Sequence, residues 1–184
     1  VWHILGARDS ETNLEAMDIV RLGGRLKMHT FDKVIDITTN NLGDTRTANR
    51  KPSFDEFQEA NRYHTYDVQN VMHGIAKLIN EAGANHDYTK AFYEAEFYSD
   101  FCKVLDGSTE KFTDMEWYQN HIKEERHHIN NRCPEDVDLI DIIEHVVDCC
   151  CAGKTRSGYI SPVVIDSEIL QKAVNNTVKL IDNN

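Results

Sequence analysis

Residues 53–87 read SFDEFQEANRYHTYDVQNVMHGIAKLINEAGANHD and carry the clearest helical pattern of the chain. Ser53 and Glu56 form a capping-box pair, in which the serine side chain accepts a backbone N–H and the glutamate reaches back to the serine N–H. Gly83 is a typical residue for ending a helix. Between these signals, apolar residues recur with roughly the helical period: Phe54, Phe57, Val68, Val71, Met72, Ile75, Leu78 and Ile79. The pattern predicts one long helix that ends just before His86 and Asp87.

Helical patterns also fill the rest of the chain, and they predict helices at about 90–105, 113–130, 134–152 and 167–181. A second capping box, from Thr113 to Glu116, starts one of these helices, and Pro134 starts the next. We therefore expect a mainly α fold, built as a bundle of about five helices.

Residues 1–52 have a different pattern. A short helix is expected at 13–22, and the β-branched residues of 33–39 favour a strand. Residues 40–52 are polar and typical of a loop. We expect 1–52 to form a small N-terminal accessory segment of mixed α/β structure, beside a helical domain at 53–184.

The composition limits the classes of function. The 184 residues suit one domain, and 40% apolar with 28% charged residues is a globular balance. A net charge of −11 argues against binding duplex nucleic acid, but bound cations can still make a local site attractive to a small phosphate. No apolar run approaches the length of a membrane span. The five cysteines are odd in number and three are consecutive, which favours reduced thiols and a cytoplasmic location.

The His86-Asp87 pair is the sharpest local candidate for chemistry, because it offers an imidazole nitrogen and a carboxylate to a divalent cation. The competing interpretation is that Asp87 caps the next helix while His86 lies in the loop. His64 is in register with Val68 and Ile75, on the apolar face of the long helix. A histidine there is either a satisfied core residue, the commoner case for a lone histidine, or an inward-facing ligand.

The expected third helix carries three histidines, His121, His127 and His128. Seven residues separate His121 from His128, which returns to nearly the same helical face, whereas His127 is turned by about 100°. Glu124 and Glu125 lie between them and could orient an imidazole. The alternative is a charged face exposed to solvent.

Asp148 lies in a helical turn that is otherwise apolar on every side. A carboxylate in such surroundings is costly unless it is paired or bound to a metal. Asp148 is therefore the best single candidate for a functional residue, and the competing interpretation makes it a buried partner of Lys154 or Arg156.

In this order, the residues resemble the HD superfamily of metal-dependent phosphohydrolases. That superfamily has a histidine on one helix, a His-Asp pair at the next junction, further histidines and a late aspartate. Over roughly residues 60–180, the chain resembles more closely an HD-like family of phage and bacterial genomes. The matching pieces are His64 with Val68-Gln69, His86-Asp87 with Lys90, Arg126-His127-His128, and Leu139-Ile140-Asp141 through Glu144 to Asp148. Cys149 departs from the pattern, which favours an aromatic residue after the final aspartate, and residues 1–52 have no counterpart.

The resemblance implies hydrolysis of a nucleotide or another small phosphoester, with a divalent metal (Mn, Fe, Co, Mg, Ni or Zn) as cofactor. Asp87 and Lys90 are the implied catalytic residues, and Lys90 would contact the phosphate. The alternatives are a non-catalytic protein that binds a nucleotide or a protein on the same fold, and a structural helical protein with surface histidines. The sequence leaves the oligomeric state open. The implied metal ligands are His64, His86, Asp87, His121, His128 and Asp148.

Overall fold

The computed structural model describes residues 28–109 and 111–182, and within them the chain is mainly helical with no strand. This confirms the expected fold class, whereas the helix predicted at 13–22 lies outside the described residues. None of the described helices combines the length and the apolar character that crossing a membrane requires. In chain order the helices are α2 (Phe54–Asn85), α3 (Tyr88–Phe92), α4 (Glu94–Leu105), the 3-10 turn η1 (Phe112–Asp114), α5 (Glu116–Glu124), α6 (Ile129–Arg132), α7 (Leu139–Ser157) and α8 (Ser167–Asp182).

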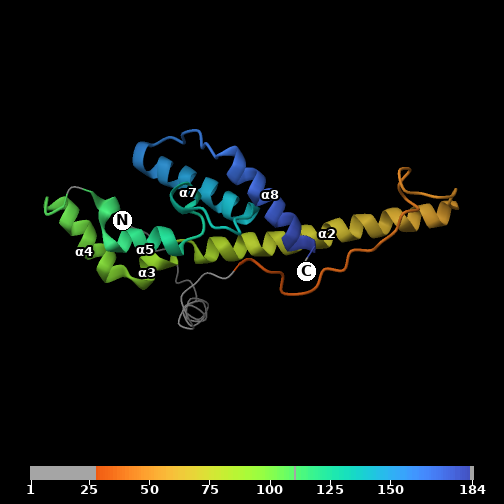
Figure 1. Cartoon of the computed structure of the whole chain (residues 1–184), viewed down its shortest axis with the longest axis horizontal. Coiled ribbons are helices and arrows are strands. Elements are labelled where there is room, and N and C mark those ends of the chain that lie inside the picture. The colour runs from red at the N-terminus through yellow and green to blue at the C-terminus, as the bar shows by residue number, and fades with distance from the viewer. Residues whose placement is uncertain (1–27, 110, 183–184) are drawn as a thin grey trace, which may run out of the picture.

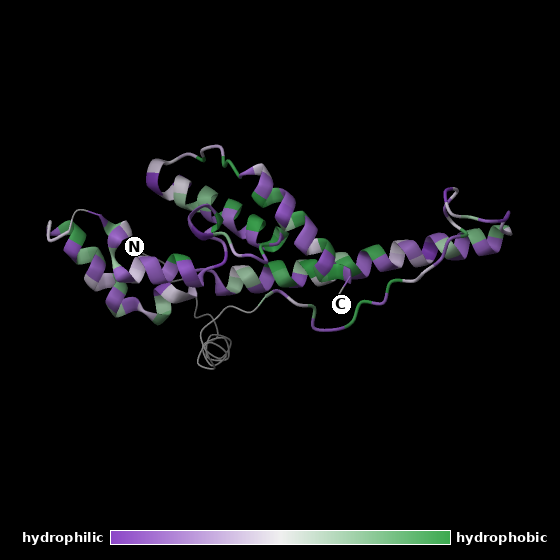
Figure 2. Cartoon of the chain, in the orientation of Figure 1, coloured by the Kyte–Doolittle hydropathy of each residue, from purple (hydrophilic) through white to green (hydrophobic). Residues whose placement is uncertain are grey.

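Helix α2 extends from one end of the molecule to the group formed by α3, α4 and α5 (Figure 1). It begins as predicted, with the Ser53 hydroxyl accepting from the backbone N–H of Glu56 at 3.2 Å and the Glu56 carboxylate accepting from that of Ser53 at 2.8 Å. It continues unbroken past Gly74 and Gly83 to Asn85. Its C-terminal half packs against α7, and its N-terminal half extends beyond the bundle (Figure 1). Polar and apolar residues alternate along this free half (Figure 2).

The segment 28–52 lies along α2 in an extended but irregular conformation (Figure 1). The strand predicted at 33–39 is therefore wrong, since the described part of the chain offers no second strand with which it could pair. Contacts with α2 take the place of pairing. The backbone N–H of Thr38 donates to the buried Asp67 carboxylate at 2.9 Å. Gly74 provides room, because a Cβ there would lie within 2.9 Å of the Phe31 and Ile35 side chains.

Three of the predicted helices differ in their boundaries. The helix expected at 90–105 is divided into α3 and α4 at Tyr93. The helix expected at 113–130 begins later, at α5, and is interrupted between Glu124 and Ile129. The helix expected from Pro134 begins only at Leu139, where Asp138 and Asp141 form a capping box that outweighs the proline signal.

The apolar core lies where α6, α7 and α8 meet. Ile129, Val137, Ile142 and Ala173 are buried together there. A smaller aromatic group holds α4 against α5, with the Phe97 and Trp117 rings stacked at 4.1 Å between centroids. The two groups flank the C-terminal end of α2, and they fix the position of the loop between α5 and α7 relative to that end.

Candidate metal centre

Asp87 connects α2 to α3 in a left-handed backbone conformation, with φ of 56°. It is the only non-glycine residue with positive φ among the described residues. Such a conformation costs free energy and persists mainly where the surrounding structure requires it, often at functional sites. Because of the turn, Asp87 does not cap α3 with its side chain, which is the role that the competing interpretation gave it.

Two groups of three potential ligands converge around Asp87. One consists of His86, Asp87 and His127, and the other of Asp87, His121 and His128. In each group the ligand atoms lie within 4.8 Å of one another. The Asp87 carboxylate lies 3.3 Å from Nε2 of His86, 3.4 Å from Nε2 of His121 and 3.7 Å from Nε2 of His127. Ligand atoms that share a cation at about 2.0–2.3 Å are themselves separated by roughly 3–3.5 Å, so these spacings suit coordination.

Unpartnered polar atoms also point to a cation. Oδ1 of Asp87 and Nε2 of His127 are buried without a hydrogen-bond partner. A buried polar atom without a partner costs about 1–3 kcal/mol, and native structures rarely retain one without a reason. The two atoms lie 3.7 Å from each other, so a cation bound between them would satisfy both.

Glu144 of α7 orients two of the imidazoles from behind. Its Oε1 lies 2.9 Å from Nδ1 of His86 and 3.1 Å from Nδ1 of His127, although only the His86 contact has hydrogen-bond geometry. Burial opposes ionisation of Glu144, but His127 and His86 lower its pKa to about 2. A carboxylate behind the Nδ1 atoms directs the Nε2 atoms toward Asp87, which is the usual arrangement behind metal-binding histidines.

Thr89 and Glu125 orient the third imidazole. Glu125 accepts from the backbone N–H of Thr89 at 2.9 Å and from its hydroxyl at 2.6 Å. The Thr89 hydroxyl therefore accepts from Nδ1 of His121, at 2.6 Å, which leaves Nε2 of His121 as the unprotonated ring nitrogen. That atom lies 2.8 Å from Nε2 of His128. Burial lowers the pKa of His121 to about 3 and that of His128 to about 4, so both rings are neutral and suited to bind a metal.

The carboxylates around His86 give the site a negative charge that a positive partner must balance. Asp148, Asp87 and Glu144 surround His86 and raise its pKa to about 12. Burial works against ionisation of Asp87, but His86 and Lys90 hold its pKa below the usual range. The carboxylates are therefore ionised at neutral pH, and either protons or bound cations can balance them.

Most of the predicted site residues lie at this centre. His86, Asp87, His121 and His128 converge, and the ammonium of Lys90 is paired with the Asp87 carboxylate. Asp148 borders the centre at 3.7 Å from Nε2 of His86 but belongs to neither group of three.

His64 does not join them. It is exposed on α2, 22 residues before His86. At a rise of 1.5 Å per residue, roughly 33 Å of uninterrupted helix separates the two histidines.

Four residues of the centre were not among the predicted ligands. His127 was the open alternative to His128, and the interruption after α5 brings both rings in. Glu144 lies four residues before Asp148 on α7, a spacing that could have revealed it. Glu125 acts on an imidazole as the spacing suggested, but through Thr89, whose role no sequence signal indicates.

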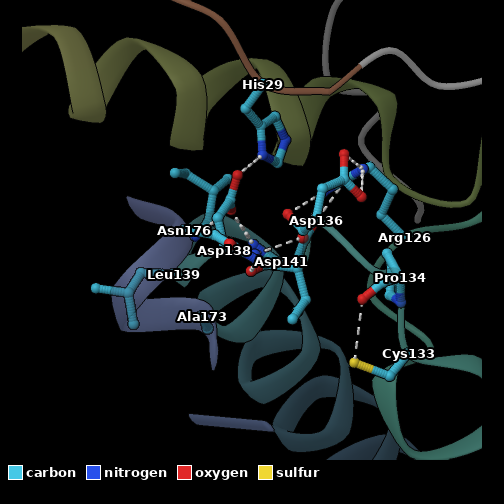
Figure 3. A network of polar contacts seen from close by, with 12 residues as sticks. His29, Arg126, Cys133, Pro134, Asp136, Asp138, Leu139, Asp141, Ala173 and Asn176 are labelled. Carbon is cyan, nitrogen blue, oxygen red and sulfur yellow. Dashed lines mark hydrogen bonds and ion pairs between the residues drawn. The ribbon is translucent and has the colours of Figure 1, made fainter. Parts of the chain in front are cut away.

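A third group, His29, Asp138 and Asp141, lies at the start of α7 and has a structural role (Figure 3). Nδ1 of His29 lies 2.6 Å from the Asp138 carboxylate, whose other oxygen caps α7. Both Asp141 oxygens accept from Arg126, at 2.9 and 2.8 Å. Since its oxygens already have partners, this group links segment 28–52 to α7 and does not resemble the centre at Asp87.

Comparisons of the chain with protein-family models, with curated proteins and with solved structures gave no match. The resemblance of its motif order to the HD superfamily therefore stays a prediction.

Proposed function

We propose that this protein is a metal-dependent phosphohydrolase whose divalent cations bind around Asp87. The observation that carries the proposal is the position of one ionised carboxylate between two sets of histidines, with one of its oxygens buried and without a hydrogen bond. A carboxylate shared in this way suits a pair of cations. His86 and His127 would hold one of them, and His121 and His128 the other.

A bound divalent cation supplies a Lewis acid for the phosphoryl group and lowers the pKa of a water molecule. In hydrolysis the water oxygen bonds to phosphorus while the P–O bond to the alcohol breaks, and the proton that the water loses balances the one that the departing alkoxide takes up. Lys90 has a half-exposed side chain beside Asp87 and can turn toward a phosphoryl oxygen to balance its charge. Glu144 and the Thr89–Glu125 pair keep the imidazoles oriented. The resemblance makes nucleotides the first substrates to test.

Two substitutions test the proposal. Asp87→Asn keeps the shape and tolerates the left-handed backbone, but it removes the shared charge, so we expect loss of stoichiometric metal and of hydrolysis. Lys90→Ala should keep the metal and slow turnover by about 10²–10³-fold. The measurements are metal content by mass spectrometry and product formation, followed by chromatography, from a panel of nucleoside mono-, di-, tri- and cyclic phosphates with Mn²⁺, Fe²⁺, Co²⁺ or Mg²⁺.

Lys103→Ala is the matched control, because Lys103 also pairs with an aspartate three residues earlier, Asp100, away from the centre. It should change neither property. A wild-type protein that lacks metal after loading would refute the metal centre. Full metal occupancy without hydrolysis, together with tight binding of one nucleotide, would instead support the non-catalytic alternative.

A further inference from the structure

A mostly apolar cavity of about 250 Å³ lies between α2 and α7, next to the candidate metal centre. Ile79, Ala82 and Gly83 line it from α2, and Ile143 and Val147 line it from α7. The cavity is open on one side, where Gly83, Ile143 and Val147 are exposed to solvent. The two sets repeat every three to four residues, so the cavity lies between the facing sides of the two helices. It exists because the small residues Ala82 and Gly83 leave unfilled the space that larger side chains would occupy.

The cavity is continuous with the metal centre, because His86, Glu144 and Asp148 line both. No lysine or arginine is among the described residues that line it. The nearby cation, Lys90, is paired with Asp87 instead. A phosphate group would therefore be held at the cations and Lys90, whereas the cavity, with the Glu144 and Asp148 carboxylates in its lining, would repel a second anion.

We propose that this cavity binds an apolar, uncharged substituent of the substrate, of the size of one aromatic ring. The inference rests on the proposed function and narrows its substrate class to phosphoesters of apolar alcohols. An engineered apolar cavity of about 150 Å³ holds benzene, so the size is sufficient. The mostly apolar walls have few partners for the hydrogen-bonding edges of a nucleobase, whereas burial of a hydrocarbon against them is favourable.

Gly83→Leu tests the inference without threatening the fold. A Cβ at Gly83 would meet no atom within 4 Å, and a non-glycine residue favours the helix. The leucine side chain should occupy the cavity, whereas Gly83→Ala should leave most of it open. Gly153→Leu is the control on α7, because its Cβ would make only an ordinary contact with the Tyr159 carbonyl and it does not line the cavity.

The first measurement is independent of hydrolysis. Phenol titrated into the protein should shift the methyl NMR signals of Ile143 and Val147 in the wild type, Gly83→Ala and Gly153→Leu, but not in Gly83→Leu. The second measurement compares benzyl phosphate, whose leaving group is a primary alkoxide, with methyl phosphate, whose leaving group is methoxide. The wild type should prefer the benzyl ester in kcat/KM by about 10–100-fold, as burial of one ring would give, and Gly83→Leu should remove the preference.

The outcomes separate this inference from the proposed function. Phenol binding that Gly83→Leu abolishes, without hydrolysis of either ester, would support the cavity and count against the phosphohydrolase. Equal kcat/KM for the two esters, unchanged in Gly83→Leu, would support the phosphohydrolase and overturn the cavity. Absence of phenol shifts in the wild type would also overturn it.

Discussion

Thr89 has a larger part in the centre than its residue type suggests. Its side chain is buried, and its hydroxyl stands between His121 and Glu125. Burial raises the pKa of Glu125, and its two hydrogen bonds from Thr89 oppose that shift. One hydroxyl therefore fixes the tautomer of an imidazole and helps to solvate a buried carboxylate.

Thr89→Val should weaken metal binding by about 10–100-fold, because valine keeps the shape but releases His121 from its orientation. Isothermal titration with Mn²⁺ or Co²⁺ measures this change. Thr177→Val is the matched control. Thr177 is also buried, and its hydroxyl also makes two hydrogen bonds: it accepts from the Leu139 N–H and donates to the Ala173 carbonyl. It lies away from the centre. Equal loss of affinity in both variants would mean that Thr89 acts only through stability.

The candidate site could be predicted from the sequence only where chemistry and spacing coincide. The His86-Asp87 pair is contiguous, and Asp148 stands out because a carboxylate in apolar surroundings needs a partner. His64 was placed by helical register, which tells which face a residue occupies but not how far along the helix the site lies. Glu144 and Thr89 act through contacts between distant segments, which a single sequence does not reveal.

At the scale of elements, α2 is both a wall of the centre and the support for segment 28–52. Its start was predictable because the Ser53 capping box is local and self-contained. The capping box expected at Thr113 does not form, since Met115 is the N-cap of α5 and η1 precedes it. The interruption after α5 depends on the burial of Glu125 and His127, a tertiary effect that overrides the helical pattern.

Gly74→Ala should release segment 28–52 from α2, although alanine has the higher helix propensity. Its Cβ would lie within 2.9 Å of side-chain atoms of Phe31 and Ile35, so both side chains must shift and their packing against α2 is weakened. Hydrogen exchange should therefore increase in 28–52, with helix content by circular dichroism unchanged. Gly83→Ala, in the same helix with open space around its Cβ, should leave exchange in the segment as it was.

The contact between His29 and Asp138 makes the attachment of this segment depend on pH. Burial opposes protonation of His29, but the hydrogen bond to Asp138 and the charges of Asp138 and Asp141 outweigh burial and the repulsion from Arg126, so its pKa is raised. A raised pKa stabilises the folded state fully below pH about 6.5, and the stabilisation is lost as the pH rises through the folded-state pKa.

Protection of 28–52 from hydrogen exchange, corrected for the intrinsic rate, should therefore fall as the pH rises from about 6.5 through the folded-state pKa of His29. His29→Gln should abolish the pH dependence, and His73→Gln, which changes an exposed histidine of α2, should retain it. A pH dependence that survives in His29→Gln would assign the effect to another group.

At the scale of the whole molecule, the candidate ligands come from the residues that follow α2 and from the α5–α6 region. Glu144, which orients two of the imidazoles, comes from the middle of α7. Because these segments meet only in the folded state, the complete site exists only there. A cation that binds it should therefore raise the free energy of unfolding by about 2.7 kcal/mol when its concentration is 100 times its Kd. Urea unfolding with Mn²⁺ or with EDTA measures the difference. His64→Ala should show the same difference as the wild type, and Asp87→Asn should show none.

The length of α2 also affects the hydrodynamic properties of the protein. With 32 residues the helix is about 48 Å long, whereas a compact chain of this length has a radius of gyration of about 16 Å. The free N-terminal half of α2 and the segment beside it thus give the molecule a rod-like extension (Figure 1). Its frictional coefficient should exceed that of a sphere of equal mass, and a monomer should leave a gel-filtration column early enough to be mistaken for a larger assembly. Mass should therefore be measured by light scattering or sedimentation equilibrium, neither of which depends on shape.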